Sequence, residues 1–105
     1  MTSDDTPLDE SVLDDAESAY RDARARLAEV PVEVVVTNHV MGLYELAAIH
    51  LSATPPRLHE AALAIDALAC LVEGLGERLG PDSVTMAEAL SNIRIAFVQI
   101  KNSAG

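Results

Sequence analysis

The sequence predicts an all-α fold: a small bundle of three to four helices, built from antiparallel helical hairpins, that assembles into a homo-oligomer. Apolar residues recur at spacings of three and four over most of the chain, which is the period of a helix. Only two tyrosines and one phenylalanine are aromatic, so the core must be built from Leu, Val, Ile and Ala. The β-branched run at residues 32–36 is the one candidate strand, and the sequence offers no second strand to pair with it. A length of 105 residues suits one domain.

The chain is acidic, with a net charge of −10 and eight of its seventeen acidic residues between Asp4 and Asp22. Its seven basic residues are scattered, which argues against direct nucleic-acid binding and against a polybasic membrane anchor. The start of the chain has neither a basic patch nor an apolar run, so no secretory signal is expected. The longest apolar-rich stretch, residues 40–51, is shorter than the about 20 residues that cross a bilayer. With Cys70 as the single cysteine, these features predict a cytoplasmic protein that does not bind membranes.

The first thirty residues predict a tail followed by an accessory helix. Residues 1–10 are polar, acidic and interrupted by Pro7, which favours a disordered acidic tail. Residues 11–30 are expected to form an amphipathic helix, because their apolar residues share one face. That stripe is poor in large apolar groups, so the helix is expected to add little to the stability of the fold. The stripe consists of Leu13, Ala16, Tyr20, Ala23, Leu27 and Val30.

Residues 31–101 are predicted to be the helical bundle domain. Pro31 can open its first helix, and the sequence Thr-Pro-Pro at residues 54–56 ends it. The next helix is expected from about Pro56 to Leu79, with Gly80 as its C-terminal cap. The last helix begins near Ser83, and residues 102–105 are expected to fray. The apolar positions follow a heptad spacing: Leu58, Ala61, Ile65, Leu68, Val72, Leu75 and Leu79, then Met86, Leu90, Ile93, Phe97 and Ile100.

His39 and His50 are the first candidates for chemistry, because they lie on one face of the same predicted helix. Eleven residues separate them, which is about 16 Å along a helix. One metal ion cannot bind both, since metal–nitrogen bonds are only about 2 Å long. We therefore expect structural polar residues, each hydrogen-bonded. A metal- or ligand-binding role for His50 together with His59 is the weaker alternative. The histidines share their predicted core-facing stripe with Val32, Val35, Val36, Leu43 and Leu46.

No catalytic or cofactor-binding motif is recognisable, so we expect no catalytic residue, no cofactor, no bound metal and no enzyme activity. Cys70 lies inside a predicted helix, where a thiol is expected to be buried and inert. Arg94 is the third candidate structural polar residue, because it lies among apolar neighbours. Its expected role is pairing with an acid such as Glu45 or Asp66, and anion binding is a distant alternative.

The predicted helix that begins at Pro31 is apolar nearly all round, and such a helix must be covered on most sides. Two further helices of the same chain can cover one broad face. The simplest way to bury the other face is to pack it against a second copy of the chain in a two-fold dimer. The expected oligomer interface consists of Val34, Met41, Tyr44, Ala48 and Leu51.

Residues 30–100 resemble a bacterial family common in actinobacteria, the domain of unknown function family eighteen-forty-four. The resemblance rests on "VPVEVVVTNHVMGLYELAAIHLSA", "HEAALAIDALACLVEGL" and "MAEALSNIRIAFVQI". The middle helix matches the family pattern at Ala61, Ile65, Asp66 and Leu68, and the last helix matches it at Arg94 and Phe97. The resemblance implies a small helical fold and no activity to transfer. It also suggests a link to ribosome function, because some members are encoded near translation genes.

The predicted function is that of a homo-oligomerising or protein-partner-binding module without catalytic activity. The alternative is a translation- or ribosome-associated regulatory protein. Such a regulator would act through a protein surface, because the negative charge disfavours RNA.

Overall fold

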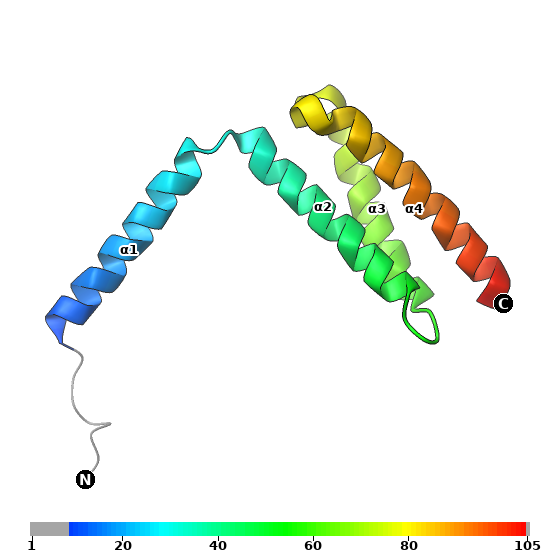
Figure 1. The fold of residues 1–105 in the computed structure, drawn as a ribbon, viewed down its shortest axis with the longest axis horizontal. Coiled ribbons are helices and arrows are strands. Elements are labelled where there is room, and N and C mark those ends of the chain that lie inside the picture. Colours follow the sequence, from blue (N-terminus) through cyan, green and yellow to red (C-terminus); the bar gives the residue numbers. More distant parts are fainter. Residues whose placement is uncertain (1–8, 105) are drawn as a thin grey trace, which may run out of the picture. The chain divides into compact units, whose positions relative to one another are not determined.

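The computed structural model describes residues 9–104, and in this part of the chain it contains helices and no strand. The all-α class is therefore confirmed for these residues. The elements are α1 (Glu10–Glu29), α2 (Val32–Leu51), α3 (Leu58–Leu75), the 3₁₀ helix η2 (Gly76–Asp82) and α4 (Ser83–Ala104) (Figure 1). The chain divides into two units, with α1 in the first and α2 to α4 in the second.

Helix α1 begins with a capped first turn. The Asp9 side chain accepts a hydrogen bond of 3.0 Å from the Ser11 backbone N–H, and Val30 follows the last turn in an extended conformation. None of its residues is buried, and Tyr20 and Leu27 are 66% and 59% exposed. The helix begins at Glu10, so the acidic tail expected for residues 1–10 ends earlier than predicted. Residues 1–8 of that tail lie outside the described residues.

Helix α2 starts directly after Pro31 and includes the β-branched run that alone could have formed a strand. Its last turn leads into a six-residue connection whose ends are held by backbone hydrogen bonds. Ser52 N–H donates to Ala48 C=O at 2.9 Å, and Arg57 N–H donates to His50 C=O at 2.9 Å. These bonds satisfy carbonyl groups that a helix end leaves without partners. They bring the start of α3 back to the end of α2, as expected for a helical hairpin.

Helix α3 ends earlier than the sequence predicts. Gly76 takes a φ of +51°, a conformation that residues with a Cβ rarely adopt, and the α-helix therefore ends at Leu75 instead of Leu79. Residues 76–82 form η2, in which Gly80 has a φ of +85°. A Cβ on Gly80 would lie 3.3 Å from Cγ of Glu33 on α2, so this turn passes close to the first turn of α2. The predicted cap at Gly80 is thus the site of a second, separate bend.

Helix α4 continues to Ala104, past Asn102, where fraying is expected to begin. No proline or glycine occurs between Lys101 and Ala104, so no residue there opposes the helical conformation. Gly105 is outside the described residues.

Helices α2, α3 and α4 enclose a single core together with Leu79 of η2 (Figure 1). Leu68, Leu79 and Val40 are its largest fully buried side chains. The apolar periodicity of α3 and α4 is confirmed, because its central positions are buried and Phe97 and Ile100 pack against them. The core residues are Val40, Ala47, Leu51, Ala61, Ala64, Ile65, Leu68, Ala69, Val72, Leu79, Met86, Leu90 and Ile93.

The rotation of α2 differs from the prediction. The core-facing side contains Thr37, Val40, Ala47 and Leu51. Val36 and Leu43 of the predicted stripe pack against the core, but Val32 and Leu46 are 71% and 43% exposed, so the prediction is wrong at these two positions. Because α2 is apolar on nearly every side, its sequence period fits more than one face equally well.

A buried hydrogen bond joins α2 to η2. The Thr37 hydroxyl donates to the Leu79 carbonyl at 3.3 Å, and these residues are 7% and 2% exposed. Thr37 is the only polar residue in the core of residues 9–104. The bond satisfies a carbonyl of the irregular turn that water reaches poorly. Thr37 therefore fixes the end of α3 and the start of α4 against the first half of α2.

Substituting Thr37→Val should lower the free energy of unfolding by about 1 to 3 kcal/mol, because the Leu79 carbonyl loses its donor while the side-chain volume is kept. Chemical denaturation monitored by circular dichroism measures the change. Thr37→Ser is the matched control, because it retains the hydroxyl and loses one methyl group. A valine variant as stable as the wild type would show that this hydrogen bond contributes nothing.

Deleting residues 1–29 should leave α2 to α4 folded, because no residue of α1 is buried. We expect a cooperative thermal transition in the shortened chain, with a midpoint within a few degrees of that of the full chain. Loss of cooperative melting in the shortened chain would contradict the assignment of α1 as an accessory helix.

Candidate functional site

The side of α2 that points away from the core contains an apolar stripe, which we call the α2 outward face. It consists of Val35, His39, Gly42, Leu46 and Ile49, spaced four, three, four and three residues apart. Leu46 and Ile49 are 43% and 63% exposed, and Val35 is half-buried. This spacing places the five residues on one side of the helix, where Leu46 and Ile49 are neighbouring exposed apolar groups and His39 and Gly42 separate them from Val35.

A shallow groove of about 470 Å³ lies beside this stripe, between α2 and α3. Gly42 forms part of its floor, and a Cβ at this position would meet no atom within 4 Å. The space above Gly42 is therefore open, and an apolar side chain from another molecule could approach the α2 backbone there. The groove is lined by Asn38, His39, Gly42, Leu43 and Leu71.

His39 is exposed, and its Nδ1 lies 2.8 Å from the Val35 carbonyl oxygen of its own helix. The imidazole is thus hydrogen-bonded, as expected, but it belongs to the outward face and not to the core. His50 is half-buried, and its backbone carbonyl closes the connection to α3. The two histidines therefore have different surroundings, although the sequence period assigns them to one stripe.

The alternative metal pair requires further ligands for His50 and His59. His59 is exposed at the start of α3, in a shallow pocket with Glu60 and Asp66. Within residues 9–104, no three side chains of His, Cys, Asp or Glu lie close enough to hold one ion. Zinc sites in proteins use three or four such ligands, so the arrangement here offers little support for a metal site.

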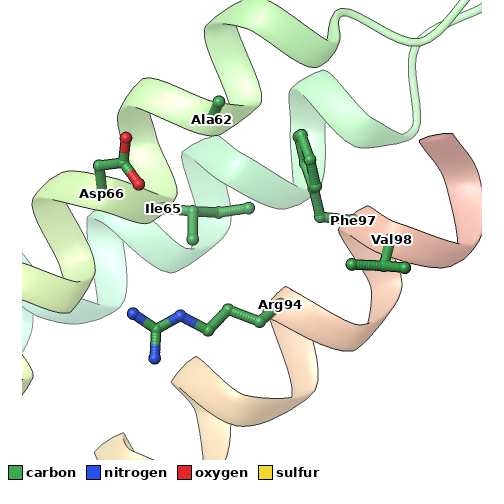
Figure 2. Close-up of a pocket in the computed structure, with 6 residues that line it drawn as sticks. All are labelled: Ala62, Ile65, Asp66, Arg94, Phe97 and Val98. Atoms are coloured by element: carbon green, nitrogen blue, oxygen red, sulfur yellow. The ribbon is translucent and has the colours of Figure 1, made fainter.

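A second hollow lies between α3 and α4 and has a volume of about 320 Å³ (Figure 2). Its walls are mainly apolar and include Ile65 and Phe97. Figure 2 shows the Arg94 side chain extending from α4 toward α3 along one end of this hollow. Arg94 also lines a second depression, together with Glu73 and Ile95. The two hollows are thus mainly apolar, and their charged lining residues are Asp66, Glu73 and Arg94.

Arg94 pairs with Glu73, and not with the acids that the sequence suggests. Its two terminal nitrogens lie 3.2 and 3.5 Å from the two carboxylate oxygens of Glu73. Asp66 lines the pocket near Arg94, but the hydrogen bonds of the guanidinium go to Glu73. The sequence spacing does not determine which acid pairs with Arg94. Asp66 and Glu73 are seven residues apart on α3, and both lie on the side of the helix that faces α4.

The predicted oligomer interface is largely turned toward the core of its own chain. Leu51 is 4% exposed and belongs to the core, and Met41, Tyr44 and Ala48 pack against it. Of the five predicted residues only Val34, at 45%, is exposed. Leu51 therefore cannot form an outward-facing interface, and Met41, Tyr44 and Ala48 are partly covered by their own chain. Cys70 is also exposed, in contrast to the expectation of a buried thiol.

Helix α2 is long and apolar enough to cross a membrane, judged by length and composition alone. The expectation that no stretch reaches this length is wrong, because the valines at the start of α2 extend its apolar part. The core helix of a water-soluble protein, which is mostly buried, meets the same criteria. Helix α2 contributes Val40, Ala47 and Leu51 to the core, and 17% of its apolar window is buried.

The Arg94–Glu73 pair should contribute less than about 1 kcal/mol to the free energy of unfolding, because its side chains are 49% and 61% exposed to water. A double-mutant cycle with Arg94→Gln and Glu73→Gln, followed by urea denaturation, measures the coupling. A coupling of about 3 kcal/mol or more would instead require a desolvated pair.

A scan against protein-family models, a search of curated proteins and a search of solved structures found no match to this chain. The resemblance to a family of unknown function therefore stays a prediction, and the function of the chain must be inferred from the geometry of its described residues.

Proposed function

We propose that this chain is a homo-oligomerising or protein-partner-binding module without catalytic activity, in which α2 to α4 form a bundle and the α2 outward face is the binding surface. The observation that carries the proposal is the pair of large apolar side chains, Leu46 and Ile49, exposed beside the open space over Gly42. Contiguous apolar groups on a surface are a common mark of a protein–protein contact.

The chemistry of this face favours a protein partner with an apolar helix. His39 and Asn38 are the polar side chains along the groove, and no Asp, Glu, Lys or Arg side chain lines it. The net charge of −10 disfavours a nucleic acid as the direct partner. A second copy of α2 meets the requirement, because a two-fold contact sets Leu46 and Ile49 of one copy against the Gly42 region of the other.

The small apolar area of this face limits the binding free energy that it can provide alone. Fully burying a leucine or isoleucine side chain gives about 1.5 to 3 kcal/mol, and these side chains are already about half-covered in their own chain. Four such side chains in a two-fold contact would give roughly 4 kcal/mol, at the lower end of the about 4 to 15 kcal/mol that association costs. The face therefore supports weak, concentration-dependent self-association, which further contacts elsewhere in the chain would strengthen.

Substituting Ile49→Glu should shift the full chain toward smaller species at micromolar concentrations, because the buried charge would oppose the apolar contact. Light scattering after size-exclusion chromatography measures the average mass. Val84→Glu on α4 is the matched control, because Val84 is 68% exposed and lies on another helix. Circular dichroism checks that both variants keep their helices.

A monomeric wild-type chain, or an Ile49→Glu variant with the mass of the wild type, would contradict the α2 outward face as the interface. Recovery of the chain on lipid vesicles in place of self-association would also contradict it. Tyr44 is unsuitable for this test, because it packs against the core and its substitution would act on folding.

A further inference from the structure

Helix α1 carries an apolar stripe of its own. Five of its positions, from Leu13 to Leu27, lie on the helix at spacings of three, four, three and four residues, the heptad spacing of a two-helix seam, and Val30 follows the last turn in an extended conformation. None of these residues is buried, and Leu13, Tyr20 and Leu27 are 45%, 66% and 59% exposed. Most of the stability of a helix in a protein comes from the packing of its apolar face and less from helix propensity. The stripe therefore calls for a partner of matching spacing.

The charges of α1 are divided along its length. Residues 9–17 contain five acidic residues and no basic one, whereas residues 18–30 contain three arginines and two acidic residues. The arginines are Arg21, Arg24 and Arg26, which are three of the seven basic residues of the chain. One half of the helix is thus strongly negative and the other half weakly positive.

We propose that α1 pairs in antiparallel orientation with α1 of a second copy of this chain. This inference rests on the proposed self-association, but it does not depend on the α2 outward face. In the antiparallel register the stripe positions meet in symmetric layers. Ala16 lies opposite Leu27 of the second copy and Tyr20 opposite Ala23, whereas Leu13, at the end of the pair, meets Val30, which follows the helix in an extended conformation. Two of the three kinds of layer combine a large side chain with an alanine, so neither crowding nor a hollow results.

The residues beside the stripe support the same orientation. Glu17 and Arg24 are seven residues apart and lie on the same flank of the stripe. In the antiparallel pair Glu17 of each copy faces Arg24 of the other, and the two-fold symmetry makes this contact twice. Within one copy Glu17 makes only a long contact of 3.8 Å to Arg21, with both side chains 69% exposed. Glu17 is therefore available to the second copy.

A parallel pair lacks these matches. It would place the five acidic residues of one copy beside those of the other, and like charges at short range repel. In a parallel pair Tyr20 of one copy would also face Tyr20 of the other, and Ala16 and Ala23 would each face the same residue. The tyrosine layer would then be overpacked and the two alanine layers underpacked. Orientation is thus decided by both packing and charge.

The remaining basic residues are poor alternatives as counter-charges for α1. Arg57, Arg78, Arg94 and Lys101 lie singly along the second unit, and Arg94 is paired with Glu73. The second unit as a whole has eight acidic residues and four basic ones. The basic half of another α1 is the cluster of positive charge that the chain offers.

The orientation can be measured with spin labels in the full chain with Cys70→Ser. Ser11→Cys and Ser18→Cys are a matched pair, because they lie seven residues apart on the side of α1 away from the stripe. In the antiparallel pair the two labels at position 11 are offset by about 32 Å along the axis and those at position 18 by about 10 Å, whereas a parallel pair gives no offset at either position. Pulsed electron–electron double resonance should therefore give the longer distance for Ser11→Cys. Equal distances at the two positions, or no distance between copies, would overturn the proposal.

Charge substitution supplies an independent readout. Glu17→Arg should weaken self-association by about tenfold, because it sets arginine against Arg24 at two places in the pair. Adding Arg24→Glu should restore both the affinity and the label distances, since the swapped charges again match. Failure of the double variant to recover would overturn the antiparallel register. Circular dichroism confirms that the helix content of each variant is kept.

These results separate the two proposals. An Ile49→Glu effect on mass without distances between α1 helices would overturn the α1 pair and leave the α2 outward face in place. Distances between α1 helices with no effect of Ile49→Glu would support the α1 pair and overturn the α2 outward face.

Discussion

The close packing of α2 against α3 is the constraint on which the rest of this structure depends. Among the described elements these two helices make the most extensive contact, and four of the residues that they bury are alanines. Ala47 on α2 and Ala61 on α3 are fully buried, and Ala64 is nearly so. Small side chains allow helix axes to approach closely, but each of them buries little apolar surface. Large residues such as Leu68 and Leu79 must then fill the space toward α4.

This division of the core explains why so many apolar residues remain outside it. A core with alanines at its closest contacts is thin, and three helices can enclose only one stripe from each. Leu63 and Val84, on α3 and α4, are 73% and 68% exposed, in addition to the α2 outward face. Single exposed apolar residues are common in soluble proteins and need no explanation. On α2, Leu46 and Ile49 are neighbours on one face beside an open groove, and this arrangement makes the face a candidate for binding.

Sequence periodicity predicted α3 and α4 well because each has one dominant stripe. Leu68 and Leu90 belong to patterns that polar residues interrupt on the other sides, so only one rotation of each helix fits. On α2 the valines and leucines continue around the helix, and the choice of face depends on which residues fit against α3. Small size and a buried hydroxyl decide it, at Ala47 and Thr37. Neither property contributes to an apolar period, so the sequence offered no signal for this rotation.

The candidate polar residues differ in how far along the chain their hydrogen-bond partners lie. His39 bonds to a carbonyl four residues earlier, within one helix turn, whereas the partner of Arg94 depends on how α3 and α4 are set along each other.

The two proposed contacts differ in their contributions: the α2 outward face mainly provides affinity, and α1 mainly determines orientation. The α2 outward face offers apolar area with almost no charge, so it adds affinity but constrains orientation little. Helix α1 offers less apolar area, since its stripe includes two alanines, but its separated charges favour one direction and one register. Charge complementarity generally contributes more to specificity than to affinity. A chain with both surfaces therefore has one weak contact that favours a single orientation, at α1, and one weak contact that constrains orientation little, at the α2 outward face. If one pair of copies makes both contacts at once, the linked contacts act at a high effective concentration, and the two together hold the copies far more tightly than either alone.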